Sequence, residues 1–127
     1  MIEFDDQMKK MLDEVDKFIE DKYGSDYPLH PARPKRGETA NPQADGLFGI
    51  RADFTPGYGS EFGRGYLINI EIKTLEFVPY EIRYNIYRDT AKKIKELLPV
   101  YFPGRKLILK KDGNHCKLLG DFSLGTL

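Results

Sequence analysis

The stretch 66–75 constrains the fold most, because its apolar and polar residues alternate in strict period two. The apolar set is Ile68, Ile70 and Ile72, and the polar set is Asn69, Glu71 and Lys73. Such alternation is typical of a β-strand that has one face in the core and the other in solvent. We therefore expect the isoleucines to point inward and the polar residues to lie on the opposite surface.

The N-terminal segment predicts an amphipathic helix. Apolar residues recur there at spacings of three and four and form one stripe: Phe4, Met8, Met11, Leu12, Val15, Phe18 and Ile19. This spacing places them all on one helix face. Asp5 and Asp6 lie in the first turn, where carboxylates complement the helix dipole, and Gly24 is expected to end the helix.

A second helix is predicted to begin at Pro79 and to end near Leu97 or Leu98. Proline is favoured at the first helical position, and Pro99 is expected to stop the helix. The predicted apolar face comprises Tyr80, Tyr84, Tyr87, Ala91, Ile94 and Leu98. Arg83 falls on the same stripe, where it would lie at the edge of the interface or pair with a carboxylate.

The remaining segments predict two hairpins and one long connection. Residues 47–54 and 66–75 read as strands joined by a glycine-rich loop over 55–65, and residues 106–110 and 116–119 form a second hairpin around Asp112-Gly113. Residues 25–45 are a proline-rich, irregular connection. The order α-β-β-α-β-β predicts one α+β domain over 1–127. We expect a two-layer sandwich in which both helices cover one face of a mostly antiparallel sheet.

Charge is balanced overall but unevenly distributed along the chain. The 127 residues include 20 basic and 20 acidic ones. Residues 1–30 hold 4 basic against 9 acidic residues, 31–64 hold 5 against 4, and 65–127 hold 11 against 7. A neutral total disfavours strong nonspecific nucleic-acid binding, but it leaves room for a local basic face or for self-association with the acidic helix.

Targeting and redox signals are sparse. The first residues are acidic, whereas a secretory signal needs a basic start, and no apolar run approaches the roughly 20 residues of a membrane span. The only cysteine, Cys116, excludes an intramolecular disulfide and is typical of a small buried hydrophobe. We expect a cytoplasmic protein without membrane association.

One pattern points to catalysis. A hydrophobic strand that ends in Glu71-Ile72-Lys73, preceded by an acid-bearing strand and followed by a helix, resembles the core of the restriction-endonuclease-like nuclease superfamily. This resemblance covers the hairpin and the second helix. It implies Mg²⁺ or Mn²⁺ held by two carboxylates, with Lys73 positioning the attacking water. Glu71 would be one ligand, and Asp45 or Asp53 the other.

The hairpin register decides which aspartate lies near Glu71. Pairing Ile50 with Ile70 places Asp53 four residues from Glu71 along the hairpin, or roughly 13 Å. Pairing Ile50 with position 66 instead sets Asp45 beside Glu71. Both registers keep the apolar faces matched, so the sequence leaves the choice open.

Basic residues offer a second kind of site. Arg33, Lys35 and Arg36 form a triplet in the proline-rich connection, and Arg64 lies in the glycine-rich loop. Together with Arg83 and the tyrosines of the second helix, they are candidates for contacts with an anion or with RNA.

No complete catalytic set is evident in the sequence. His30 and His115 are far apart and lack ligand-spaced cysteine or carboxylate clusters. The leading hypothesis is therefore a non-catalytic binding or interaction module without a cofactor, whose partner is another protein or a second copy of the chain. The alternatives are a Mg²⁺- or Mn²⁺-dependent nuclease and an RNA-binding module.

Overall fold

The structure is a computed structural model that describes residues 2–55, 65–112 and 115–120. Its elements are α1 (Ile2–Tyr23), the 3₁₀ helix η1 (Pro42–Ala44), β1 (Phe48–Thr55), β2 (Gly65–Ile72), α2 (Tyr80–Tyr101), β3 (Leu107–Asp112) and β4 (His115–Gly120). This order confirms the predicted α-β-β-α-β-β arrangement and the α+β class. The glycine-rich loop over 56–64 and Gly113 of the predicted turn lie outside the described residues.

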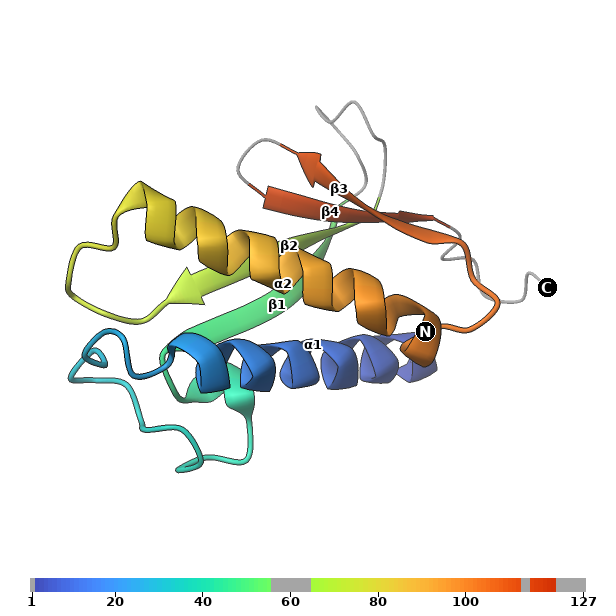
Figure 1. The fold of residues 1–127 in the computed structure, drawn as a ribbon. Helices are drawn as coiled ribbons and strands as arrows, with labels where there is room; N and C mark the ends of the chain where they lie inside the picture. The colour runs from blue at the N-terminus through green and yellow to red at the C-terminus, as the bar shows by residue number, and fades with distance from the viewer. Residues whose placement is uncertain (1, 56–64, 113–114, 121–127) are drawn as a thin grey trace.

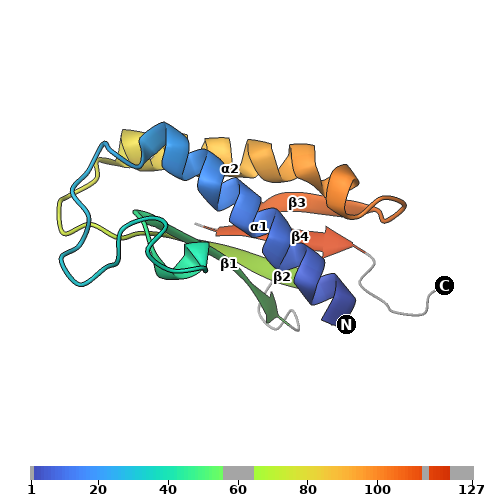
Figure 2. The same ribbon diagram turned by 90° about the horizontal axis from the view of Figure 1, so that it is seen from below.

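The four strands form one antiparallel sheet in the order β1-β2-β4-β3. Both helices cover the same face of this sheet, which gives two layers (Figures 1 and 2). β1 and β3 are the edge strands. β3 lies beside the C-terminal half of α2 (Figure 2).

The core fills the space between the helices and the covered face of the sheet. Its most buried members are Met11, Leu12, Val15 and Ile19 from α1, Phe48, Ile50, Ile68 and Leu118 from the strands, and Ile86 and Ile94 from α2. Ile70 and Ile72 are partly buried against this cluster, whereas Glu71 is exposed. The predicted orientation of the 66–75 strand is confirmed, although the strand ends at Ile72.

The register of the first hairpin is the simpler of the two alternatives. Ile50 pairs with Ile70, Asp53 with Leu67, and Gly49 with Glu71. The register that pairs Ile50 with position 66 is therefore wrong. The sheet does not place Asp45 opposite Glu71.

The predicted apolar face of α2 is correct in part. The buried residues of this helix are Ile86, Asp89, Thr90, Ile94, Leu97 and Leu98. Tyr80 and Tyr84 are 73% and 48% exposed, and Arg83 is exposed. Ile94 and Leu98 are buried as predicted, and Tyr87 and Ala91 pack partly against the core. Ile86, Thr90 and Leu97 lie about a quarter turn from Tyr80 and take the core side. Tyr80 and Tyr84 are left on a flank of the helix.

The end of α2 differs from the prediction as well. Pro99 lies inside the helix, which continues to Tyr101. Proline removes one backbone donor, but the next turn still closes, because the N–H of Phe102 donates to the carbonyl of Leu98 at 2.8 Å. A single missing hydrogen bond in the last turn is tolerated here.

The connection between α1 and β1 is irregular apart from η1, as predicted. It returns past the C-terminal part of α1 toward the start of β1 (Figure 1). The N–H of His30 donates to the carbonyl of Lys73 at 2.8 Å, and the N–H of Gly46 to that of Pro34 at 2.9 Å. Neither of the two described α-helices is long and apolar enough to cross a membrane.

Candidate functional site

The residues of the predicted nuclease site are brought together only in part. Lys73 lies 3.2 Å from the carboxylate of Glu71, with which it forms an ion pair. Asp53 lies farther along the hairpin, where its carboxylate accepts hydrogen bonds from Asn69 at 2.7 Å and Arg51 at 3.2 Å. The structure therefore joins Glu71 to Lys73 but places Asp53 in a separate polar group.

The second candidate aspartate, Asp45, is buried in another network. Its carboxylate accepts hydrogen bonds from the hydroxyl of Thr39 at 2.7 Å, from the N–H of Thr39 at 3.0 Å and from the N–H of Gly37 at 3.2 Å. Arg36 adds an ion pair at 2.9 Å. Among the described residues, no group of three or more histidine, cysteine, aspartate or glutamate side chains is arranged to hold a metal ion.

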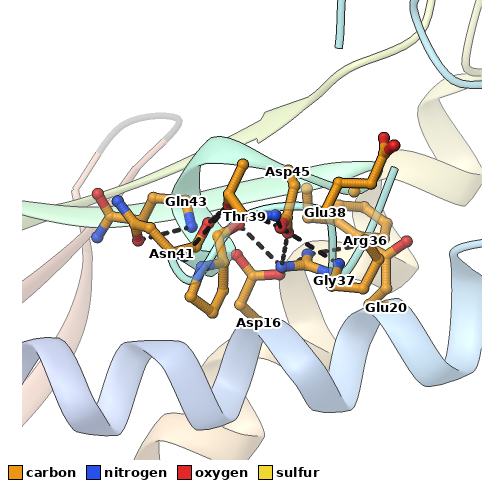
Figure 3. Close-up of polar contacts among 12 residues, drawn as sticks. Asp16, Glu20, Arg36, Gly37, Glu38, Thr39, Asn41, Gln43 and Asp45 are labelled. Atoms are coloured by element: carbon orange, nitrogen blue, oxygen red, sulfur yellow. Dashed lines mark hydrogen bonds and ion pairs between the residues drawn. The ribbon is translucent and has the colours of Figure 1, made fainter. Parts of the chain in front are cut away.

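Arg36 is the centre of this network, which we call the Arg36 cluster: Arg36 with Asp16, Glu20 and Asp45 (Figure 3). Asp16 and Glu20 project from α1, and Asp45 closes the connection just before β1. The guanidinium contacts Asp16 and lies 2.9 Å from both Glu20 and Asp45. A single side chain therefore ties the connection to α1 over a separation of 20 residues in sequence.

The Arg36 cluster contains more negative than positive charge. Three carboxylates surround one guanidinium, and the Asp16 side chain is almost completely buried. Oδ2 of Asp16 and Nε of Arg36 are buried without a hydrogen-bond partner among the described residues. Burial raises the pKa of Asp16 to about 7, although Arg36 opposes this. One proton on Asp16 near neutral pH reduces the excess negative charge of the cluster.

Two other groups of the cluster, Arg36 and Asp45, have pKa values shifted in the direction that favours their charged forms. Burial alone would lower the pKa of Arg36, but its hydrogen bond to Glu20 and the charge of Asp16 raise it above its ordinary value. Burial would raise the pKa of Asp45, but hydrogen bonds from Thr39 and the charge of Arg36 hold it below its usual range. These opposite shifts leave Asp16 as the group that carries the proton.

Arg33 performs a related structural task beside the Arg36 cluster. Its guanidinium donates to the backbone carbonyls of Gln43, Asp45, Gly46 and Phe48 over 2.8–3.2 Å. These carbonyls belong to the end of the connection and the start of β1. Arg33 therefore replaces the backbone partners that this irregular segment lacks.

Of the basic residues proposed from the sequence, Arg33 and Arg36 make these internal contacts. Lys35 and Arg83 are exposed, the latter on α2, while Arg64 lies outside the described residues. Within that set, Lys35 and Arg83 therefore have side chains that a ligand could reach.

A different basic site is formed by the C-terminal half of α2 and the edge strand β3. An open groove of about 530 Å³ runs there, and its lining comprises Lys95, Leu98, Pro99, Arg105, Lys106, Leu107, Ile108, Leu109 and Lys110. Four of these residues are cationic and none is acidic. We call this the α2–β3 groove. Its lining includes Ile108, which is 53% exposed.

Sequence reasoning missed the α2–β3 groove although a signal was available. Residues 83–111 hold nine basic residues against two acidic ones. The count alone does not reveal a groove, because the basic residues come from a helix, a turn and a strand. Four of them line one groove because β3 returns beside α2 (Figure 2).

Comparison with known proteins places the chain in a family. A family model described as "Uncharacterised protein" matches residues 1–120, and the chain belongs to this family. One relative is an uncharacterized protein of Borreliella burgdorferi (strain ATCC 35210 / DSM 4680 / CIP 102532 / B31). It is 43% identical over 120 residues, which cover 94% of each chain. No solved structure matches.

Proposed function

We propose that the protein is a non-catalytic binding module whose ligand is a nucleic acid held by its phosphates in the α2–β3 groove. The main observation is the lining of this groove, where the exposed lysines Lys95, Lys106 and Lys110 occur together and none of the described lining residues is acidic. Several cations along one groove can each replace a counterion on the phosphate backbone, which is the main source of nucleic-acid affinity.

The balanced total charge is compatible with this role, because the charges are segregated. The acidic residues of α1 lie in another part of the chain, and two of them, Asp16 and Glu20, are paired with Arg36. Local charge, rather than the net charge of the molecule, sets the potential that a phosphate meets in the groove.

An acidic peptide added as a fifth strand beside β3 is the competing ligand for the same groove. The nucleic acid is favoured because the cations continue beyond the strand. Arg88 and Lys92 lie on the exposed side of α2, which a peptide paired with β3 would not use. A phosphate backbone can follow both the strand and the helix.

The test is fluorescence anisotropy with a labelled oligonucleotide of about twelve nucleotides at low salt. Replacing both groove lysines (Lys106→Glu with Lys110→Glu) should weaken binding by about 100-fold, because two attractive contacts become repulsive. The matched control is Lys10→Glu with Lys17→Glu on α1. It changes the net charge equally at exposed positions outside the groove and should leave the affinity within about threefold.

Three results would overturn the proposal. The wild-type protein could fail to bind any oligonucleotide at low salt. Both double variants could lose affinity equally, which would reduce the effect to net charge. A polyglutamate peptide could displace the oligonucleotide and bind more tightly than it, which would assign the groove to an acidic protein segment.

A further inference from the structure

Two tyrosine rings on the exposed flank of α2 have no structural task in the described part of the molecule. Tyr80 and Tyr84 are 73% and 48% exposed, and their rings stack on each other with centroids 6.4 Å apart and planes inclined by 30°. Neither hydroxyl has a hydrogen-bond partner among the described residues. Immediately before the helix, Phe77 adds a third ring that is 82% exposed.

Other tyrosines of the chain are used differently. Three donate their hydroxyl groups to carboxylates: Tyr23 to Asp89, Tyr66 to Asp5 and Tyr101 to Glu14. Tyr27 and Tyr87 are partly buried against the core. The exposure of Tyr80 and Tyr84 is therefore a local feature of the start of α2 and not a general property of tyrosine in this fold.

The tyrosine pair is in line with the α2–β3 groove. Positions 80, 84, 88, 91 and 95 follow each other at spacings of three and four and share one side of the helix. Tyr84 and Lys95 are eleven residues apart, which corresponds to about 17 Å along the helix axis. About five stacked nucleotides span that distance at 3.4 Å each.

Cations lie beside the rings as well as at the far end. Arg83 and Arg88 each follow one of the two tyrosines within one turn, and both are exposed. Glu81 is the acidic residue of the first turn, and the exposed guanidinium of Arg88 also lies 3.3 Å from Asp89. An exposed ring with an arginine one turn away offers a base a surface to stack on and offers the adjoining phosphate a counter-charge.

We infer that Tyr80 and Tyr84 form a stacking platform for unpaired bases, so that the ligand of the α2–β3 groove is single-stranded. Bases in a duplex are already stacked and paired, and only splayed bases can lie on a protein ring. This inference rests on the proposed function. It adds the substrate class, because the groove alone would accept either form of nucleic acid.

The test uses the full chain and one sequence of DNA and of RNA, each as a single strand and as a duplex. Replacing both rings (Tyr80→Ala with Tyr84→Ala) should weaken single-strand binding at least tenfold and leave duplex binding within about twofold. Replacing both by phenylalanine should retain single-strand binding, because the stacking surface is kept. The residual affinity of the alanine variant should still depend on salt.

A direct reporter is available because the chain contains no tryptophan. Tyr84→Trp places one indole in the proposed platform, and single strands should quench its fluorescence at saturation. Val100→Trp is the matched control. It lies on the same helix at a position 68% exposed, away from the line of Tyr84 and Lys95, and its emission should not change.

The outcomes separate this inference from the proposed function. Equal loss of single-strand and duplex binding in the alanine variant, or an unquenched indole at position 84 on a saturating single strand, would overturn the platform while groove binding stands. Absence of oligonucleotide binding by the wild-type protein would overturn both. A tenfold selective loss with quenching only at position 84 would support the platform.

Discussion

The Arg36 cluster and the α2–β3 groove contain the same kinds of charged residue in opposite circumstances. In the cluster, one guanidinium meets three carboxylates from α1 and the connection, and the groups are largely buried. In the groove, four cations line an open surface without an acidic neighbour among the lining residues. The first arrangement pairs opposite charges inside the fold, and the second leaves the ammonium groups of Lys95, Lys106 and Lys110 exposed.

The difference shows that topology decides what a basic residue does. Arg36 lies in a loop and reads as a surface residue in the sequence, but the connection folds back over α1 and buries its contacts. Lys110 belongs to β3, and Lys106 directly precedes this strand. Both remain exposed, and β3 is an edge strand beside α2.

The largest effect on stability is expected from removing the cation of the Arg36 cluster. Arg36→Met should lower the free energy of unfolding by about 3 kcal/mol, since buried carboxylates would lose their partner. Lys35→Met is the matched control at an exposed neighbour and should change stability by less than about 0.5 kcal/mol. Urea denaturation at neutral pH measures both, and equal stabilities of the two variants would refute a structural role for Arg36.

A smaller, graded effect should follow pH. The pKa of Asp16 is raised from 3.8 to about 7 by burial, so between these values the unfolded chain has released a proton that the folded chain still holds. The contribution of Asp16 to stability is therefore complete below pH 3.8 and falls as pH rises toward 7, by up to about 1.4 kcal/mol per pH unit. Asp45 behaves in the opposite way. Because its pKa is lowered in the folded state, its ionised form stabilises the fold, and this contribution is lost as pH falls.

Asp16→Asn isolates this effect, because the amide resembles the protonated acid in shape and cannot ionise. As pH rises from 4 to 7, the free energy of unfolding of the wild type should fall relative to that of Asp16→Asn. Above pH 7 the difference between the two should become constant. Asp21→Asn, at an exposed position of the same helix, should show a nearly constant difference. A constant difference for both variants would mean that Asp16 is ionised throughout.

Much of the fold was predictable from local patterns. The alternation at Ile68, Ile70 and Ile72 identified β2 and its buried face, and matching apolar residues gave the observed pairing of Ile50 with Ile70 as one of two registers. Choosing between the registers required knowledge of the length and geometry of the turn, which the alternation of apolar residues does not define. Helix rotation was less predictable, because tyrosine counts as apolar although its ring tolerates solvent.

The candidate sites depended on contacts that no local pattern contains. Asp16 and Arg36 are 20 residues apart, and their pairing follows from how an irregular connection returns over α1. The α2–β3 groove required the strand order, which sets β3 at the edge. The sequence therefore indicated a basic second half. Our candidate site nevertheless used the basic residues of the connection, and two of these, Arg33 and Arg36, make contacts inside the fold.

The salt dependence of oligonucleotide affinity tests the central claim, that the cations of the α2–β3 groove bind phosphates, most directly. With the three groove lysines engaged on a single strand, the logarithm of the association constant should fall against the logarithm of salt concentration with a slope of about −2. Lys106→Gln with Lys110→Gln should reduce the slope to about −0.7, whereas Lys10→Gln with Lys17→Gln should leave it unchanged. A slope near zero, or one that the groove variant does not alter, would contradict the claim.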